Sequence, residues 1–216
     1  MPTQPTYELI YFTARGGGEI SRLLFAQAGV EFKDTRLTQD EFKAVKGDVT
    51  RAPLGQLPVL IVKGTATPFP PIPQSHAIER YLARAFDMYG KNIEEATRID
   101  VACECVVEIF THIVKMFFEN DDAKKKELGK SFVEKDSKTI LTAMCDALKK
   151  NSGGKGFFVG DKMTLADIAV FHMTEAIFGS MPPLAAMYPA LKEFSDRMRA
   201  EPKIAAWLKK RPVTQF

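Results

Sequence analysis

Three consecutive glycines, Gly16 to Gly18, follow a strand-like segment and precede a helix-like one, an arrangement that often holds a phosphate group. A Walker loop requires two glycines separated by four residues and then lysine with serine or threonine, and the sequence contains no such pattern. A dinucleotide fingerprint, G-x-G-x-x-G, is met at Gly16 and Gly18 but fails at Ser21. Because neither motif is complete, we do not expect a nucleotide site at these glycines.

The aromatic residue before the glycines offers a different chemistry. Tyr11 lies at the end of the strand-like segment TYELIYF, and a phenol with a pKa near ~10 donates a hydrogen bond while it stays neutral beside an anion. A donor directed at a bound thiol favours the thiolate, and each unit of lowered pKa corresponds to about 1.4 kcal/mol. Tyr11 also fits as one of several strand aromatics, beside Tyr7 and Phe12, and residue type alone favours this second interpretation.

The cysteines and histidines form no recognisable reactive centre. Cys103, Cys105 and Cys145 make an odd, low count that argues against a disulfide scaffold. No cysteine occurs in the first 85 residues, which excludes thioredoxin-type exchange there. Cys103 and Cys105 are two apart in a helical pattern and point in different directions. The histidines lack partners at ligand spacing, so no metal site is expected; they are His76, His112 and His172.

The composition of the 216-residue chain is that of an ordinary globular protein, with 45% hydrophobic and 26% charged residues. A net charge of +3 makes no electrostatic case for nucleic acid as a partner. No apolar run approaches the ~18–20 residues of a membrane span, and the opening MPTQPTYELI does not have the pattern of a signal peptide. We therefore expect a cytoplasmic protein without a membrane partner.

Strand and helix patterns alternate over residues 1–85 in the order β-α-β-α-β-β-α, which predicts a small mixed sheet with helices on its faces. Ser75 is the expected N-cap of the last of these helices. Thr164 and Asp167 form a capping-box pattern that we assign to folding. Strand signals disappear after about residue 95, and helices are expected at 98–118, 125–150, 164–179, 189–200 and 202–210. The prediction is an α/β N-terminal domain joined to a larger all-α domain.

Five segments in the same order along the whole chain resemble the cytosolic glutathione S-transferases, and most of all the sigma class with its haematopoietic prostaglandin D synthases. They are YELIYFTARGGGEISRLLFAQAG, GQLPVL, QSHAIERYLAR, MTLADIAV and AWLKKRPVTQF. The resemblance implies a thioredoxin-like glutathione-binding domain at 1–85, a linker at 86–94 and an all-α domain at 95–216 that contributes a hydrophobic electrophile site. It also implies glutathione as cosubstrate, no required metal, and a homodimer.

The resemblance assigns the glutathione contacts residue by residue. Tyr11 matches the tyrosine that hydrogen-bonds the glutathione sulfur, while Gln74 and Ser75 match the pair that holds the γ-glutamyl carboxylate. Pro58 matches the family's cis-proline, which leaves the Leu57 backbone to pair with the cysteinyl part of glutathione. The other implied contacts are Phe42, where the sigma class often has tryptophan, Lys46 toward the glycine carboxylate, the neighbouring Gln56, and Glu108 from the partner subunit.

Simpler interpretations stay open for some of these residues. Ser75 fits as a plain N-cap, and Glu108 fits as part of a solvated acidic stripe with Asp100 and Glu104. The implied electrophile site has residues from both domains, with core packing as the alternative for the helical ones. Its members are Phe12, Thr13, Arg15, Gly17, Phe110, Met116 and Phe216.

Three departures separate the chain from the sigma pattern. Gly17 stands where the pattern has a second arginine that assists the tyrosine, residues 47–53 are longer than usual and move Lys46, and residues 65–73 add a proline-rich loop. The resemblance implies attack of a tyrosine-stabilised glutathione thiolate on hydrophobic electrophiles. The alternatives are a prostaglandin-type isomerase, against which the missing arginine weighs, and a non-catalytic ligand-binding or crystallin-like relative.

Overall fold

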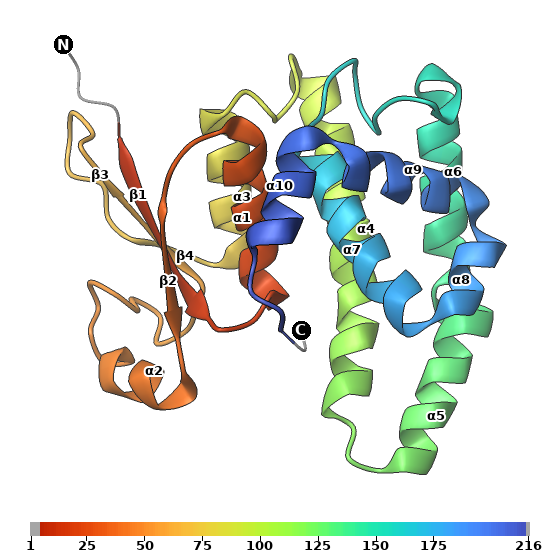
Figure 1. Cartoon of the computed structure of the whole chain (residues 1–216), viewed down its shortest axis with the longest axis horizontal. Coiled ribbons are helices and arrows are strands. Elements are labelled where there is room, and N and C mark those ends of the chain that lie inside the picture. The colour runs from red at the N-terminus through yellow and green to blue at the C-terminus, as the bar shows by residue number, and fades with distance from the viewer. Residues whose placement is uncertain (1–4, 215–216) are drawn as a thin grey trace. The chain divides into compact units, whose positions relative to one another are not determined.

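The computed structural model describes residues 5–214 and divides the chain into two compact units (Figure 1). The first unit holds the residues up to Phe86 together with those from Pro202 onward, and the second is Asp87–Glu201. Sequence patterns alone assign residues 202–216 to the all-α domain. The structure instead groups helix α10 (Pro202–Lys210) with the first unit, because α10 packs against helix α1 (Glu19–Ala28).

The first unit is built on a four-stranded mixed sheet with the strand order β2-β1-β3-β4. The edge strand β2 (Lys33–Leu37) runs parallel to β1 (Thr6–Phe12), and β3 (Val59–Lys63) runs antiparallel to both β1 and the short β4 (Ile72–Pro73). Helices α1, α2 (Gln39–Val45) and α3 (Ser75–Ala85) complete the predicted order β-α-β-α-β-β-α. This is the expected thioredoxin-like arrangement.

Side chains along β1 alternate between the two faces of the sheet. On one face, the Tyr7 ring lies 5.3 Å from the Phe25 ring of α1. On the other, the Phe12 ring lies 5.2 Å from the Phe42 ring of α2, centroid to centroid. Tyr11 shares its face with Tyr7, so it lies on the side of the sheet that α1 covers.

Helix α3 begins differently from the sequence prediction. Ser75 is the first helical residue, and Gln74 occupies the N-cap position, so the prediction of Ser75 as N-cap is wrong. Gln74 makes no side-chain capping bond, and its backbone has a φ of +74°, a conformation that disfavours a side chain. The chain turns sharply into α3 at Gln74, and this turn shifts the helix start by one residue.

The second unit is all helical in its regular structure. The long helix α4 spans Ile93–Phe118, while the single helix expected at 125–150 is three segments: α5 (Asp122–Ser131), the π-helical η2 (Phe132–Asp136) and α6 (Lys138–Lys150). Helix α7 (Leu165–Ser180) packs mainly against α4 and α9 (Pro189–Ala200). The short α8 (Pro182–Met187) has no counterpart in the prediction, because a six-residue helix shows too little periodicity.

Helix α7 is the core helix of this unit, and its first turn is fixed by the predicted Thr164–Asp167 pair. The buried Asp167 carboxylate accepts hydrogen bonds from the Thr164 N–H at 2.8 Å, the Thr164 hydroxyl at 2.8 Å and the Phe158 N–H at 2.7 Å. Burial raises the pKa of Asp167 to about 6 although these hydrogen bonds oppose the shift.

Candidate active site

Tyr11 lies near the carboxyl end of β1, where the chain leaves the sheet and turns through the 3-10 helix η1 (Gly16–Gly18) into α1. The N–H of Gly17 donates a hydrogen bond of 3.0 Å to the Tyr11 hydroxyl oxygen. This contact fixes the phenol by using its acceptor capacity, and the hydroxyl proton remains available for donation to a ligand. Tyr11 is half-buried, which leaves a ligand access to it.

The glycines of η1 are required by their close approach to Tyr11. A Cβ atom at Gly16 would stand 2.6 Å from the Tyr11 hydroxyl oxygen, and the φ of Gly16 is +33°. A Cβ atom at Gly18 would stand 2.8 Å from Cδ1 of the same ring. Any side chain at Gly16 or Gly18 would therefore displace the phenol or the turn.

The middle glycine lies between three of the predicted site residues. A Cβ atom at Gly17 would be 3.6 Å from the Tyr11 hydroxyl oxygen, 3.7 Å from Pro58 Cδ and 3.7 Å from Ser75 Cβ. These distances bring together the end of β1, the segment before β3 and the start of α3. A Cβ at Gly17 would make ordinary van der Waals contacts with all three residues.

Two of the predicted glutathione contacts have an unusual backbone geometry. The Leu57–Pro58 peptide bond is cis, as the resemblance implies. Gln74, which is exposed at the N-cap of α3, has a positive φ that costs a non-glycine residue about 1–3 kcal/mol. Gln74 directly precedes Ser75, the first residue of α3, and the first N–H groups of a helix have no partner within it.

The remaining predicted residues of the first unit include Phe12, on the sheet face opposite to Tyr11, and residues at the end of α2 and in the loops that follow β1 and precede β3. Phe12 packs edge-to-face on Phe42, as described above, and its ring lies 5.5 Å from that of Tyr11. Lys46 is exposed at the C-cap of α2, and its side chain passes 3.7 Å from the Cβ position of Gly55, next to Gln56. Among the other predicted residues, Arg15 and Leu57 are half-buried, and Thr13 and Gln56 are exposed.

Three predicted residues lie on α4 of the second unit. Glu108 is exposed. The Phe110 ring stacks on His172 at 5.2 Å, and Met116 is 8% exposed within the helical core. Phe216 lies outside the described residues.

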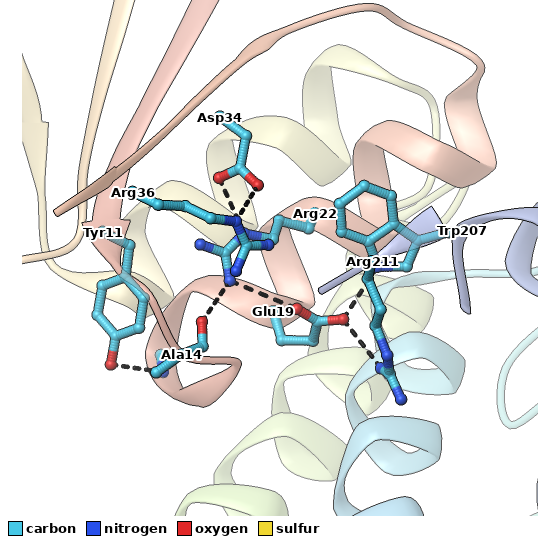
Figure 2. A network of polar contacts seen from close by, with 9 residues as sticks. Tyr11, Ala14, Glu19, Arg22, Asp34, Arg36, Trp207 and Arg211 are labelled. Carbon is cyan, nitrogen blue, oxygen red and sulfur yellow. Dashed lines mark hydrogen bonds and ion pairs between the residues drawn. The ribbon is translucent and has the colours of Figure 1, made fainter. Parts of the chain in front are cut away.

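The sequence prediction missed a buried ionic network behind Tyr11. The Arg22 guanidinium lies 5.8 Å from the centroid of the Tyr11 ring and donates a 2.6 Å hydrogen bond to the carbonyl of Ala14 (Figure 2). Glu19 and Asp34 pair with Arg22. Glu19 and Arg22 are both 0% exposed on α1. The sequence feature that could have indicated this network is a pair of opposite charges three positions apart in an otherwise apolar helix.

Two general searches of the described residues add no further site. None of the helices there is sufficiently long and apolar to cross a bilayer. Histidine, cysteine, aspartate and glutamate side chains nowhere gather in threes around a position fit for a metal ion, as far as residues 5–214 are concerned.

Comparison with known proteins places this geometry in a family. The family model "Glutathione S-transferase, C-terminal domain" matches residues 107–211. The chain is 39% identical to S-crystallin SL11 of Nototodarus sloanii over 98% of its own length and 100% of that protein. It is 30% identical to the solved sigma class GST of Fasciola hepatica, with a TM-score of 0.88 over 99% of this chain and 100% of the other. The chain belongs to the glutathione S-transferase family.

A further solved relative of this glutathione S-transferase is prostaglandin synthase D of Nilaparvata lugens. The two are 31% identical, with a TM-score of 0.81 over 97% of this chain and 100% of the other. The fold and the sigma-class likeness expected from sequence are thereby confirmed. Members of the glutathione S-transferase family use glutathione as cosubstrate.

Proposed function

We propose that this glutathione S-transferase is catalytically active and that Tyr11 stabilises the thiolate of bound glutathione for attack on hydrophobic electrophiles. The observation that carries the proposal is the hydrogen bond from the Gly17 N–H to the Tyr11 hydroxyl oxygen, which fixes the phenol beside Gly17, whose Cβ position lies 3.7 Å from both Pro58 and Ser75. A preorganised donor at the place where negative charge develops is usually the largest single contribution to catalysis.

The start of α3 suits the carboxylate of the γ-glutamyl group. Ser75 contributes a hydroxyl in the first turn of an 11-residue helix whose N-cap, Gln74, makes no side-chain capping bond. The first N–H groups of such a helix and its dipole favour an anion. Gln74 and Ser75 would hold this end of glutathione, with the Leu57 backbone beside Pro58 holding the middle and Lys46 and Gln56 near the glycine end.

The electrophile site and the assembly belong to the same proposal. The electrophile side of Tyr11 would be formed by Phe12, Thr13, Arg15 and Gly17 from the first unit, with Phe110 and Met116 from α4. We also propose a cytoplasmic homodimer, in which Glu108 reaches the glutathione amine of the partner subunit. Sedimentation of the wild-type protein together with glutathione affinity of Glu108→Gln tests this part, and a monomer with full affinity would contradict it.

The test of the central role is Tyr11→Phe, which removes one hydroxyl. Turnover of a model aryl halide should fall about 10²-fold, the usual effect of losing one preorganised donor, while glutathione affinity changes much less. Tyr7→Phe is the matched control, because Tyr7 lies on the same strand and sheet face but packs on Phe25 in the core. Unchanged turnover in Tyr11→Phe would overturn the assignment.

Two alternatives have support from relatives. The likeness to S-crystallin SL11 favours a non-catalytic, crystallin-like role, which failure to bind a glutathione matrix would support. The likeness to prostaglandin synthase D of Nilaparvata lugens favours isomerisation of a prostaglandin endoperoxide, which direct assay with the endoperoxide decides. The Tyr11 geometry favours the transferase over the first, and Gly17 in place of a second arginine weighs against the second.

A further inference from the structure

Helix α1 carries two fully buried charges that the proposed reaction does not use. Glu19 and Arg22 are both 0% exposed, although taking a charge out of water is unfavourable unless it is paired and hydrogen-bonded. One oxygen of Glu19 lies 3.4 Å from Arg22 Nη1. The Arg22 guanidinium lies between the Tyr11 ring and Glu19 (Figure 2), so the partners of the pair bear on how the ring is held.

Arg22 connects the sheet to the segment that carries the glycines. Its Nε donates to Asp34 Oδ1 at 3.0 Å, and the other oxygen of Asp34 accepts from Arg36 Nε at 2.8 Å. Its Nη1 donates to the Ala14 carbonyl at 2.6 Å. We call residues 13–18 the tyrosine loop. Arg22 is thus oriented by carboxylates from two elements and fastens the loop that presents the Gly17 N–H to Tyr11.

The other oxygen of Glu19 is held by the far end of the sequence. Trp207 Nε1 donates to Glu19 Oε1 at 2.9 Å, and Arg211 Nη1 donates to the same oxygen at 3.0 Å. Trp207 lies on α10 and Arg211 directly follows it. One carboxylate oxygen of Glu19 therefore accepts hydrogen bonds from Trp207 and Arg211, and the other pairs with Arg22. A displacement of α10 would move the Glu19 carboxylate and, with it, Arg22.

Helix α10 also contacts the opposite end of α1. Lys203 Nζ donates to the Gln27 carbonyl at 2.9 Å, close to Gly29, where α1 ends. This bond links the same two helices without touching Glu19 or the tyrosine loop. Lys203 thus offers a comparison in which α10 loses a contact to α1 but the ionic network keeps all its members.

We propose that Arg22 and Glu19 are positioning residues for Tyr11, and that α10 takes part in the site through Trp207 and Arg211. The inference rests on the proposed role of Tyr11. Arg22 and Glu19 act through the tyrosine loop, by keeping the Gly17 N–H on the phenol oxygen. A small misplacement of a reacting group, about 1 Å, lowers rates on the order of 10²-fold. The C-terminal helix thereby becomes part of the machinery that aligns the catalytic hydroxyl.

The experiment compares Trp207→Phe and Arg211→Met with Lys203→Met. Each of the first two removes one donor to Glu19 while it keeps an apolar side chain in place. The first readout is hydrogen exchange of the Gly17 amide by NMR without glutathione. The second is the pH at which bound glutathione shows thiolate absorbance in the ultraviolet. Tyr11 itself is unchanged in all three variants.

We expect Gly17 exchange to accelerate at least ~10-fold in Trp207→Phe and Arg211→Met, and thiolate formation to move to higher pH. Lys203→Met should show neither change, even if it lowers the unfolding midpoint equally. Unprotected Gly17 in the wild type, or equal exchange in all three variants, would overturn the inference. Absent thiolate in the wild type would instead refute the proposed function, and the exchange comparison would still test the network.

Discussion

Gly16 approaches the Tyr11 hydroxyl so closely that a methyl group at this position would overlap the phenol oxygen, at a Cβ distance of 2.6 Å. The glycine also has a φ of +33°, which L-residues rarely adopt. The close approach of the Tyr11 ring thus requires glycine in this run. It allows the backbone to wrap around the phenol and to present the Gly17 N–H to it.

Gly16→Ala should lower the free energy of unfolding by about 2 kcal/mol or more, because overpacking adds to the strain of the left-handed backbone. The same change should reduce transferase turnover by displacing the Tyr11 hydroxyl. Gly17→Ala is the control for stability, since its added Cβ meets ordinary contact distances of 3.6–3.7 Å. Equal unfolding midpoints for the two variants in urea would contradict this account.

Gln74→Gly should stabilise the protein and weaken glutathione binding. Within residues 5–214, Gln74 and Asp87 are the non-glycine residues with positive φ, at +74° and +58°. Glycine relieves that strain by on the order of 1 kcal/mol, but it removes the side chain proposed to hold the γ-glutamyl carboxylate.

Asp87→Gly provides the comparison for Gln74→Gly, because it changes the same backbone property at an exposed position in the second unit. Thermal unfolding and glutathione titration measure both effects. Unchanged glutathione affinity in Gln74→Gly would show that Gln74 does not hold the ligand, whatever happens to the melting temperature.

Local patterns predicted the elements of the first unit, whereas the candidate residues around Tyr11 came from the family resemblance. The alternation along β1 and the helical spacing of α1 are short-range signals, and the family resemblance supplied Pro58 and Ser75, which the structure brings within 3.7 Å of the Gly17 Cβ position. The start of α3 was misplaced by one residue, because a serine before an apolar helix reads as an N-cap unless the strained Gln74 backbone is known.

The partners that α10 and the residue after it contribute to the ionic network could not be predicted from the sequence. Glu19 and Trp207 are separated by 188 positions, and Glu19 and Arg211 by 192, so no periodicity links them. The same reason explains why α10 was assigned to the all-α domain, since its own pattern shows an amphipathic helix but not the surface that covers its apolar face. Contacts between residues far apart in the sequence decide both points.

Cys105 offers a test of the electrostatics of α4. Its pKa is raised by burial and then by the carboxylates of Glu108 and Glu104. Glu108→Gln should therefore speed alkylation of Cys105 by iodoacetamide at pH 8, because the thiolate is the reacting form. Cys145, whose pKa is raised by burial and by Asp146, should keep its rate. Rates resolved by mass spectrometry of the two peptides make the comparison, and an unchanged Cys105 rate would exclude Glu108 as a cause and leave burial and Glu104.

Asp167 should make the stability of the protein depend on pH in an unusual direction. Its pKa is about 6 in the folded protein, because burial outweighs the three hydrogen bonds to the carboxylate. The unfolded chain has the ordinary value near ~3.9. The folded state therefore binds this proton more tightly, and the resulting stabilisation is complete below about pH 4 and is lost as the pH rises through 6.

The comparison is the free energy of unfolding of the wild type minus that of Asp167→Asn, measured in urea from pH 4 to pH 7. This difference should fall by up to about 3 kcal/mol as the pH rises, since one pKa unit corresponds to about 1.4 kcal/mol. Asp161→Asn should show the opposite slope, because Lys91 lowers the pKa of the exposed Asp161. A difference for Asp167→Asn that does not change with pH would mean that the buried carboxylate titrates as it does in the unfolded chain, and that its hydrogen bonds fully offset its burial.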